Sequence, residues 1–87
     1  MKGKLVEALP TQAVVEVQGV GYEVQIPLSS YDRLPAAGAE VFLLTHLAIR
    51  EDAHLLYGFL TAAERDLFRL LIHTVSGIGP KIALSVL

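Results

Sequence analysis

The hydrophobic pattern of this sequence changes its period once, near Leu60, and that change divides the chain. Before it, apolar and polar residues alternate, as they do from Val15 to Gln18, and this is the period of a half-buried strand. After it, apolar residues recur every three or four positions, as on a helix packed along one face. A chain of 87 residues has room for one small domain and part of a second. We therefore expect a β domain over residues 1–60 and a helical segment over residues 61–87.

Five short strands are predicted in the β domain. They cover residues 2–9, the run around Val15, residues 22–26, residues 40–49 and residues 54–60. The fourth is apolar on both faces, which predicts a place in the centre of a closed sheet or under a neighbour. Gly58 in the fifth indicates a bend or a close backbone approach. Residues 28–38 hold a short helical turn at most. Five strands interrupted after the third fit a Greek-key barrel of the OB type, although an SH3-like barrel gives a similar pattern.

The helical segment opens with Thr61 and Glu64, a T-x-x-E capping box in which each side chain can satisfy a free amide. The expected helix ends near Thr74. Its apolar face is predicted to consist of Leu67, Phe68, Leu71, Ile72 and Val75.

The closing stretch "VSGIGPKIALSVL" has the composition of a tight turn between two helices. Gly77 can take the positive φ that a short reversal needs, and Ile78 can pack between the helices. Gly79 leaves space for a phosphate, Pro80 suits the first helical position, and Lys81 adds a positive charge.

The spacing of this stretch, with a small residue at Ala83, matches the helix-hairpin-helix pattern, which grips duplex backbone without reading base sequence. The alternative is a helical hairpin whose glycines only turn the chain.

The composition limits the chemistry. Seven basic and nine acidic residues give a net charge of −2, so nucleic-acid binding must come from local charge and backbone dipoles. No cysteine is present, which excludes disulfides and thiolate chemistry. The three histidines lack zinc spacing, and neither a P-loop nor a Ser-His-Asp arrangement is visible. We predict no catalytic residues, no metal and no cofactor. No apolar run reaches ~18 residues and no secretion signal is seen, which predicts a cytoplasmic protein without a membrane partner.

Glu51 and Asp52 form an adjacent acidic pair between two apolar strands, next to Arg50. Taken alone, the pair fits a solvated hairpin tip. A metal-dependent nuclease would need further carboxylates converging on the same ions.

Three ordered segments carry a family resemblance: "GVGYEV" (19–24), "THLAIREDAHLLYGF" (45–59) and "GIGPKIAL" (77–84). Together they resemble the N-terminal part of the RuvA family of bacterial Holliday-junction-binding proteins, over residues 1–87. The resemblance implies a mainly β fold with α: a five-stranded OB barrel over residues 1–60, then the first, truncated helix-hairpin-helix over 61–87. Family members continue through a second hairpin and a C-terminal domain that contacts a motor, so we expect this chain to be a fragment.

The same resemblance implies function. Family members bind four-way (Holliday) junction DNA as homotetramers and work with the RuvB motor, which drives ATP-dependent branch migration, and with the RuvC resolvase. They break no bonds themselves. The implied DNA contacts are the hairpin residues Gly77, Ile78, Gly79 and Lys81, the acidic pin Glu51 and Asp52, and Arg50 as an additional candidate. Because the chain is short, tetramer formation and motor binding are in question.

Two other functions remain open at this point. The hairpin could belong to a repair nuclease or glycosylase, which would need a catalytic lysine, aspartate or metal cluster nearby. An OB barrel could bind single strands through aromatic platforms, for which Tyr22, Tyr57 and Phe59 are the candidates.

Overall fold

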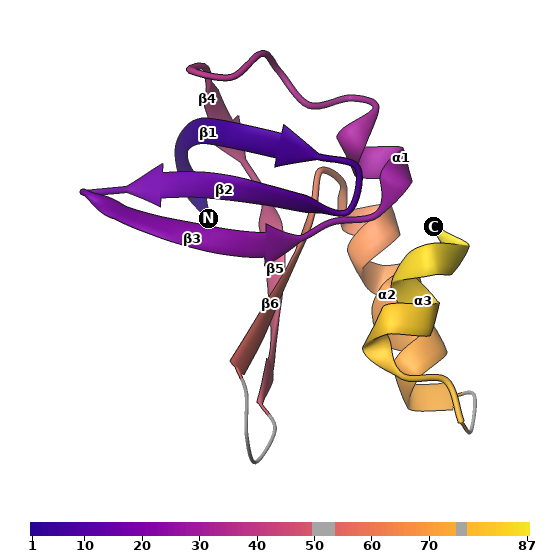
Figure 1. The fold of residues 1–87 in the computed structure, drawn as a ribbon. Helices are drawn as coiled ribbons and strands as arrows, with labels where there is room; N and C mark the ends of the chain where they lie inside the picture. The colour runs from indigo at the N-terminus through magenta and orange to yellow at the C-terminus, as the bar shows by residue number, and fades with distance from the viewer. Residues whose placement is uncertain (50–53, 75–76) are drawn as a thin grey trace.

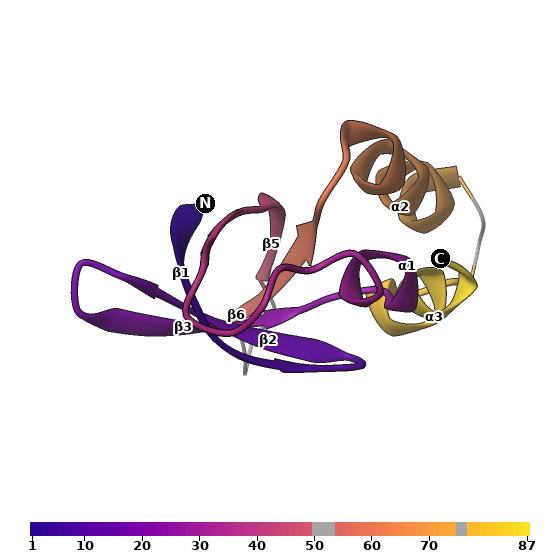
Figure 2. The ribbon, with the colours of Figure 1, turned by 90° about the horizontal axis from the view of Figure 1, so that it is seen from above.

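The computed structural model describes residues 1–49, 54–74 and 77–87. These form a mainly β molecule with one curled sheet and a few helices at one end of it (Figures 1 and 2). The strands are β1 (Lys2–Leu9), β2 (Gln12–Val17), β3 (Val20–Gln25), β4 (Glu40–Phe42), β5 (Leu44–Ile49) and β6 (His54–Phe59). The helices are α1 (Leu28–Tyr31), α2 (Ala62–Thr74) and α3 (Pro80–Val86). The strand order in the sheet is β4-β1-β2-β3-β6-β5, and only the β3–β6 pair is parallel.

One stretch of chain, residues 40–49, borders both ends of this sheet. Its first part, β4, pairs with β1, and its second part, β5, pairs with β6. Between the two parts, the Leu43 amide donates to the Met1 carbonyl at 2.7 Å, and the Met1 amino group donates to the Leu43 carbonyl at 2.6 Å. Because the two outermost strands are consecutive in the chain, the sheet has to curl. This curled sheet is consistent with the predicted OB fold.

Two expectations for the fourth predicted strand are wrong. The structure divides it at Leu43, giving six strands in the described residues instead of five. It is also not central, because β4 and β5 are the outermost strands, and Phe42, Leu47 and Ile49 are exposed. Residues 40–49 carry apolar side chains on both faces: Val41 and Leu43 contribute to the core, and the opposite face is exposed to solvent. Local periodicity cannot distinguish an open apolar face from a covered one.

Two hydrophobic clusters lie on opposite faces of the β5–β6 pair. The first fills the curled sheet and consists of Leu5, Ala13, Val15, Val24, Ile26, Val41 and Leu43. The second lies under the helices and consists of Tyr57, Phe59, Phe68 and Ala83. Successive side chains of β6 alternate between them: Leu56 packs on the first cluster, and Tyr57 on the second.

Helix α2 starts and ends where the sequence predicted, but fewer of its apolar side chains are buried than the sequence predicted. Phe68 is fully buried, and Leu71 and Ile72 pack beside it, as expected. Leu67 is 42% exposed, so that part of the predicted face is wrong in this structure. The predicted contribution of Val75 lies outside the described residues.

Gly58 confirms the predicted close approach, and its substitution tests the packing. A Cβ there would lie 2.5 Å from Cγ1 of Val24 and 3.2 Å from Cδ1 of Leu43, both of which are buried. We expect Gly58→Ala to lower the free energy of unfolding by about 1–3 kcal/mol, because stiff core side chains must move. Urea unfolding measures this, with Gly21→Ala as the control, since a Cβ at Gly21 meets only Val14 at 3.7 Å. Equal stability of the two variants would contradict the expectation.

Candidate nucleic-acid interface

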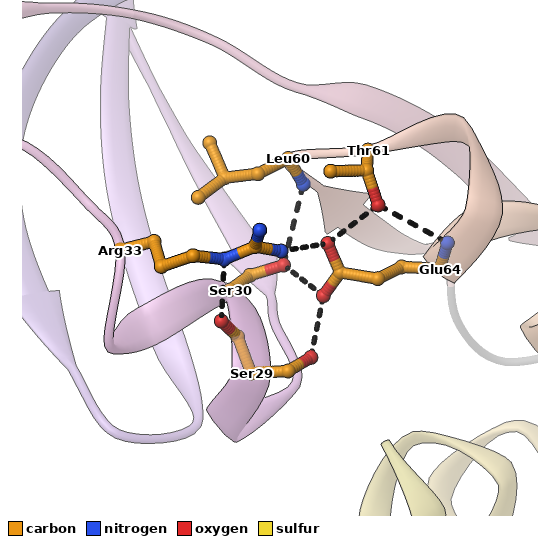
Figure 3. A network of polar contacts seen from close by, with 6 residues as sticks. All are labelled: Ser29, Ser30, Arg33, Leu60, Thr61 and Glu64. Atoms are coloured by element: carbon orange, nitrogen blue, oxygen red, sulfur yellow. Dashed lines mark hydrogen bonds and ion pairs between the residues drawn. The ribbon is translucent and has the colours of Figure 1, made fainter.

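Helix α2 is capped by Thr61, as the sequence predicted. The Thr61 hydroxyl accepts a hydrogen bond from the Glu64 amide at 3.2 Å and donates one to the Glu64 carboxylate at 2.9 Å. The amide-to-hydroxyl half of the capping box is therefore confirmed. The Glu64 carboxylate does not follow the other half of the capping box, in which it would accept a hydrogen bond from a free amide at the helix start. It is turned toward α1 and accepts a hydrogen bond from Ser30 instead (Figure 3).

The Glu64 carboxylate is the centre of a polar network between α1 and α2 (Figure 3). One oxygen, Oε2, accepts hydrogen bonds from the hydroxyls of Ser29 and Ser30, the latter at 2.9 Å. The other, Oε1, lies 2.9 Å from Nη2 of Arg33. Ser30 is fully buried, and its hydroxyl also accepts from the Leu60 amide at 3.2 Å. The network joins the chain before β4 to the start of α2. Sequence reasoning missed it because its residues are some thirty positions apart and form no local pattern.

The network changes the acidity of Glu64. Burial alone would raise the pKa of this carboxyl. Hydrogen bonds from Ser29, Thr61 and Ser30, together with the charge of Arg33, lower the pKa by more than burial raises it. The net result is a pKa below the ordinary value, so the charged form is the one the fold favours.

Aromatic packing fixes the middle of α2 on the β5–β6 pair. The Phe68 ring lies 5.0 Å from Phe59, 5.2 Å from Tyr57 and 5.5 Å from His46, measured between ring centroids. Tyr57 and Phe59 are buried in this cluster, at 3% and 0% exposure. They are therefore unavailable as platforms for single-stranded bases, and Tyr22 alone of the three predicted aromatics is exposed.

The glycine turn adopts the backbone predicted for it. Gly77 has φ +86°, the left-handed region that glycine enters without steric cost. Gly79 is extended, with φ −88° and ψ 174°, and Pro80 begins α3. Ile78 packs on the helical cluster, and Ala83 is fully buried. Lys81 is exposed on the first turn of α3.

The acidic pair Glu51 and Asp52, with Arg50, lies outside the described residues. The strands that flank it are described, and their last antiparallel pair joins Ile49 to His54. Figure 1 shows that β5 and α2 run toward the same end of the molecule. The two predicted DNA elements, the acidic pair after β5 and the glycine turn after α2, therefore both follow elements that finish on one side.

Within residues 1–49, 54–74 and 77–87, no three His, Asp or Glu side chains gather as ligands for a metal ion. In the same ranges, none of the helices has the length and apolarity needed to span a membrane.

Fold and site together define a class: a small curled-sheet β domain followed by two helices joined through a glycine turn. The comparison with protein families is more specific, since the model of the RuvA N-terminal domain matches residues 1–58. The chain belongs to this RuvA family.

Curated relatives match over the whole chain, and each is named Holliday junction branch migration complex subunit RuvA. The protein of Chromobacterium violaceum is 59% identical over 87 residues, that of Opitutus terrae 58%, and that of Methylibium petroleiphilum 55%. The alignments cover 100% of this chain but only 44%, 44% and 45% of the relatives. The chain thus spans less than half the length of these relatives and corresponds to their N-terminal part.

The lowered pKa of Glu64 gives a pH prediction. A group whose pKa is depressed by folding stabilises the fold above its unfolded pKa, and this contribution is lost as the pH falls through the folded value. Glu64→Gln should therefore cost about 1–3 kcal/mol of unfolding free energy at neutral pH and progressively less in acid. Urea unfolding at several pH values measures this. Glu40→Gln is the control, because its pair with Lys2 is solvent-exposed. A cost for Glu64→Gln that does not change with pH would contradict the assignment.

Proposed function

We propose that this chain is the structure-specific DNA-binding part of a RuvA-family subunit, which binds four-way junctions and supports branch migration by a partner motor. The observation that carries the proposal is the 55–59% identity, over every residue of the chain, to proteins named as branch migration complex subunits. The alignments cover the whole chain, including the glycine turn and α3, so the proposal includes both parts.

The proposed domains are an OB barrel over residues 1–60 and the first helix-hairpin-helix over residues 61–87. Supporting this division, β6 ends at Phe59 and α2 begins at Ala62. Helices α2 and α3 pack through Ala83 and are joined by the positive-φ turn at Gly77.

In the proposed mechanism, the backbone around Gly77, Ile78 and Gly79 approaches a phosphate, and Lys81 supplies a positive charge beside it. Contacts of this kind hold duplex arms without reading sequence. Supporting this role, Gly77 and Gly79 carry no side chain that would block the approach, and Lys81 is exposed.

The proposed acidic pin, Glu51 and Asp52, acts by repulsion. Duplex DNA carries one negative charge per ~1.7 Å of axis, so a carboxylate pair disfavours any continuous duplex laid across it. At a four-way junction the strands part in the centre and avoid the pair. The pin then gives specificity by weakening binding to the wrong substrate. Arg50 beside it is proposed as an additional contact to DNA.

The remaining features of the proposal concern assembly. We propose a non-catalytic, cofactor-free, cytoplasmic subunit that in its full-length form is a homotetramer and works with RuvB and RuvC. Apolar side chains are exposed on the outermost strands, at Phe42, Leu47 and Ile49, and we propose them as contacts between copies of the chain.

Lys81→Ala tests the hairpin contact. We expect weaker binding to duplex and junction DNA alike, and a salt dependence whose slope falls by about one unit, because one phosphate contact is lost. Fluorescence anisotropy across a salt series measures both. Lys4→Ala, a change of equal charge on β1, should leave both quantities near the starting values. An unchanged slope for Lys81→Ala would place that residue outside the interface.

Replacing Glu51 by Gln and Asp52 by Asn tests the pin. We expect affinity for linear duplex to rise more than affinity for a four-way junction, because only the duplex was repelled. Gel-shift titration of both DNA forms measures the ratio. The control replaces Glu16 and Glu23, both exposed on β2 and β3, by Gln, which gives the same change in net charge. If the two double variants change the ratio equally, the effect is one of net charge and no pin exists.

A further inference from the structure

A second group of basic side chains lies where α2 crosses β5, and none of them is among the predicted DNA contacts. We call this group the joint cluster: His46 on β5, and Arg69 and His73 on α2. The His46 ring packs edge-on against Phe68, with centroids 5.5 Å apart. Nε of Arg69 donates a hydrogen bond to Nδ1 of His46 at 3.4 Å.

Arg69 differs from the other arginines that the structure describes. Arg33 has a carboxylate at 2.9 Å, from Glu64, and Arg65 has one at 3.2 Å, from Asp66. Within the described ranges, no carboxylate lies within ion-pair distance of Arg69. Its hydrogen-bond partner there is the imidazole of His46. Burial, the charge of Arg69 and the charge of His73 all lower the pKa of His46. The guanidinium of Arg69 is thus a positive charge without a paired carboxylate in the described residues, on a chain with net charge −2.

The hydrogen-bonding groups of the cluster suit an oxyanion. A guanidinium has five N–H donors, and in the described residues only the one on Nε of Arg69 is used. Because Nδ1 of His46 accepts a hydrogen bond, the neutral ring carries its proton on Nε2, which is a further donor. A phosphate takes two parallel hydrogen bonds from a guanidinium edge, an arrangement that a lysine cannot provide.

The position of the cluster agrees with such a ligand. Helix α2 and strand β5 run toward the same end of the molecule (Figure 1), and the glycine turn follows α2 in the chain. His73 lies in the last turn of α2. His73 precedes Gly77 by four residues in the chain, so a duplex held at the glycine turn would have the C-terminal half of α2 beside it.

We propose that the joint cluster of His46, Arg69 and His73 is a phosphate-binding site that holds one phosphate of the DNA backbone. The DNA part of this inference rests on the proposed function. That the cluster binds a phosphate rests on the geometry of its residues. One measurement below tests phosphate binding without DNA, and a second tests DNA binding.

The first measurement tests the phosphate site without DNA. The imidazole signals of His46 are titrated by NMR in inorganic phosphate and in chloride at equal ionic strength. We expect phosphate to raise the pKa of His46, because a bound anion favours the charged ring. Arg69→Gln should abolish the difference between the two salts, and Arg65→Gln, four residues earlier on the same helix, should retain it. Identical titrations of the unmodified chain in both salts would overturn the proposal.

The second measurement uses duplex DNA and the same variants. We expect Arg69→Gln to weaken binding roughly tenfold and to reduce the salt slope by about one unit, because a charge-assisted phosphate contact is lost. Arg69→Lys should recover part of the affinity, and Arg65→Gln should bind like the unmodified chain. Binding of the unmodified chain should also tighten as the pH falls through the pKa of His46, by linkage. Equal affinities of the Arg69→Gln and Arg65→Gln variants would overturn the inference and leave DNA binding intact. A phosphate effect on His46 without any DNA binding would instead contradict the proposed function.

Discussion

The structure depends on one strand, β6, because both of its faces are buried by different parts of the chain. Leu56 and the close-packed Gly58 face the curled sheet, while Tyr57 and Phe59 face α2. Phe68 fills the space over these two rings and contacts His46 on the neighbouring strand. Since aromatic side chains bury much apolar area, this contact sets the position of the helical segment against the β domain. The strand pair is therefore both a wall of the barrel core and the support for the helices.

Packing around Phe68 alone would allow α2 to rotate against the sheet. The Glu64 network restricts this rotation, because it fixes the start of the helix to the α1 region. The carboxylate is held by Ser29, Ser30 and Arg33 from the α1 region, and Ser30 also accepts from the Leu60 amide. Buried polar groups of this kind are directional, because leaving any of them without a partner is costly. Because its start and its middle are both fixed, the end of α2 at Thr74, three residues before Gly77, has a defined position relative to β5. The spacing of any DNA contacts on these two elements follows from this.

Local signals in the sequence predicted much of the fold and the backbone of the turn. The strand over residues 2–9 stops before Pro10, Thr61 caps α2, and the glycine at 77 has the positive φ that a tight reversal needs. What could not be predicted depends on pairing between distant residues. The division of the fourth strand at Leu43 follows from its bonds to Met1, and the exposure of Leu67 follows from where α2 packs. The Glu64 network and the joint cluster combine residues from separate elements, so neither forms a pattern that spacing can reveal.

The charged side chains of this acidic chain are distributed unevenly over its surface. Glu64 pairs with Arg33, Asp66 pairs with Arg65, and Glu40 pairs with Lys2 on the sheet. Within the described ranges, Lys4, Arg69 and Lys81 have no such partner, and the last two lie on the two helices that the glycine turn joins. Over distances longer than the ~10 Å Debye length at moderate salt, the net charge of −2 is screened, so local cations decide which face a phosphate approaches. A weakly acidic protein can then favour contact with a phosphate through one face and disfavour it elsewhere.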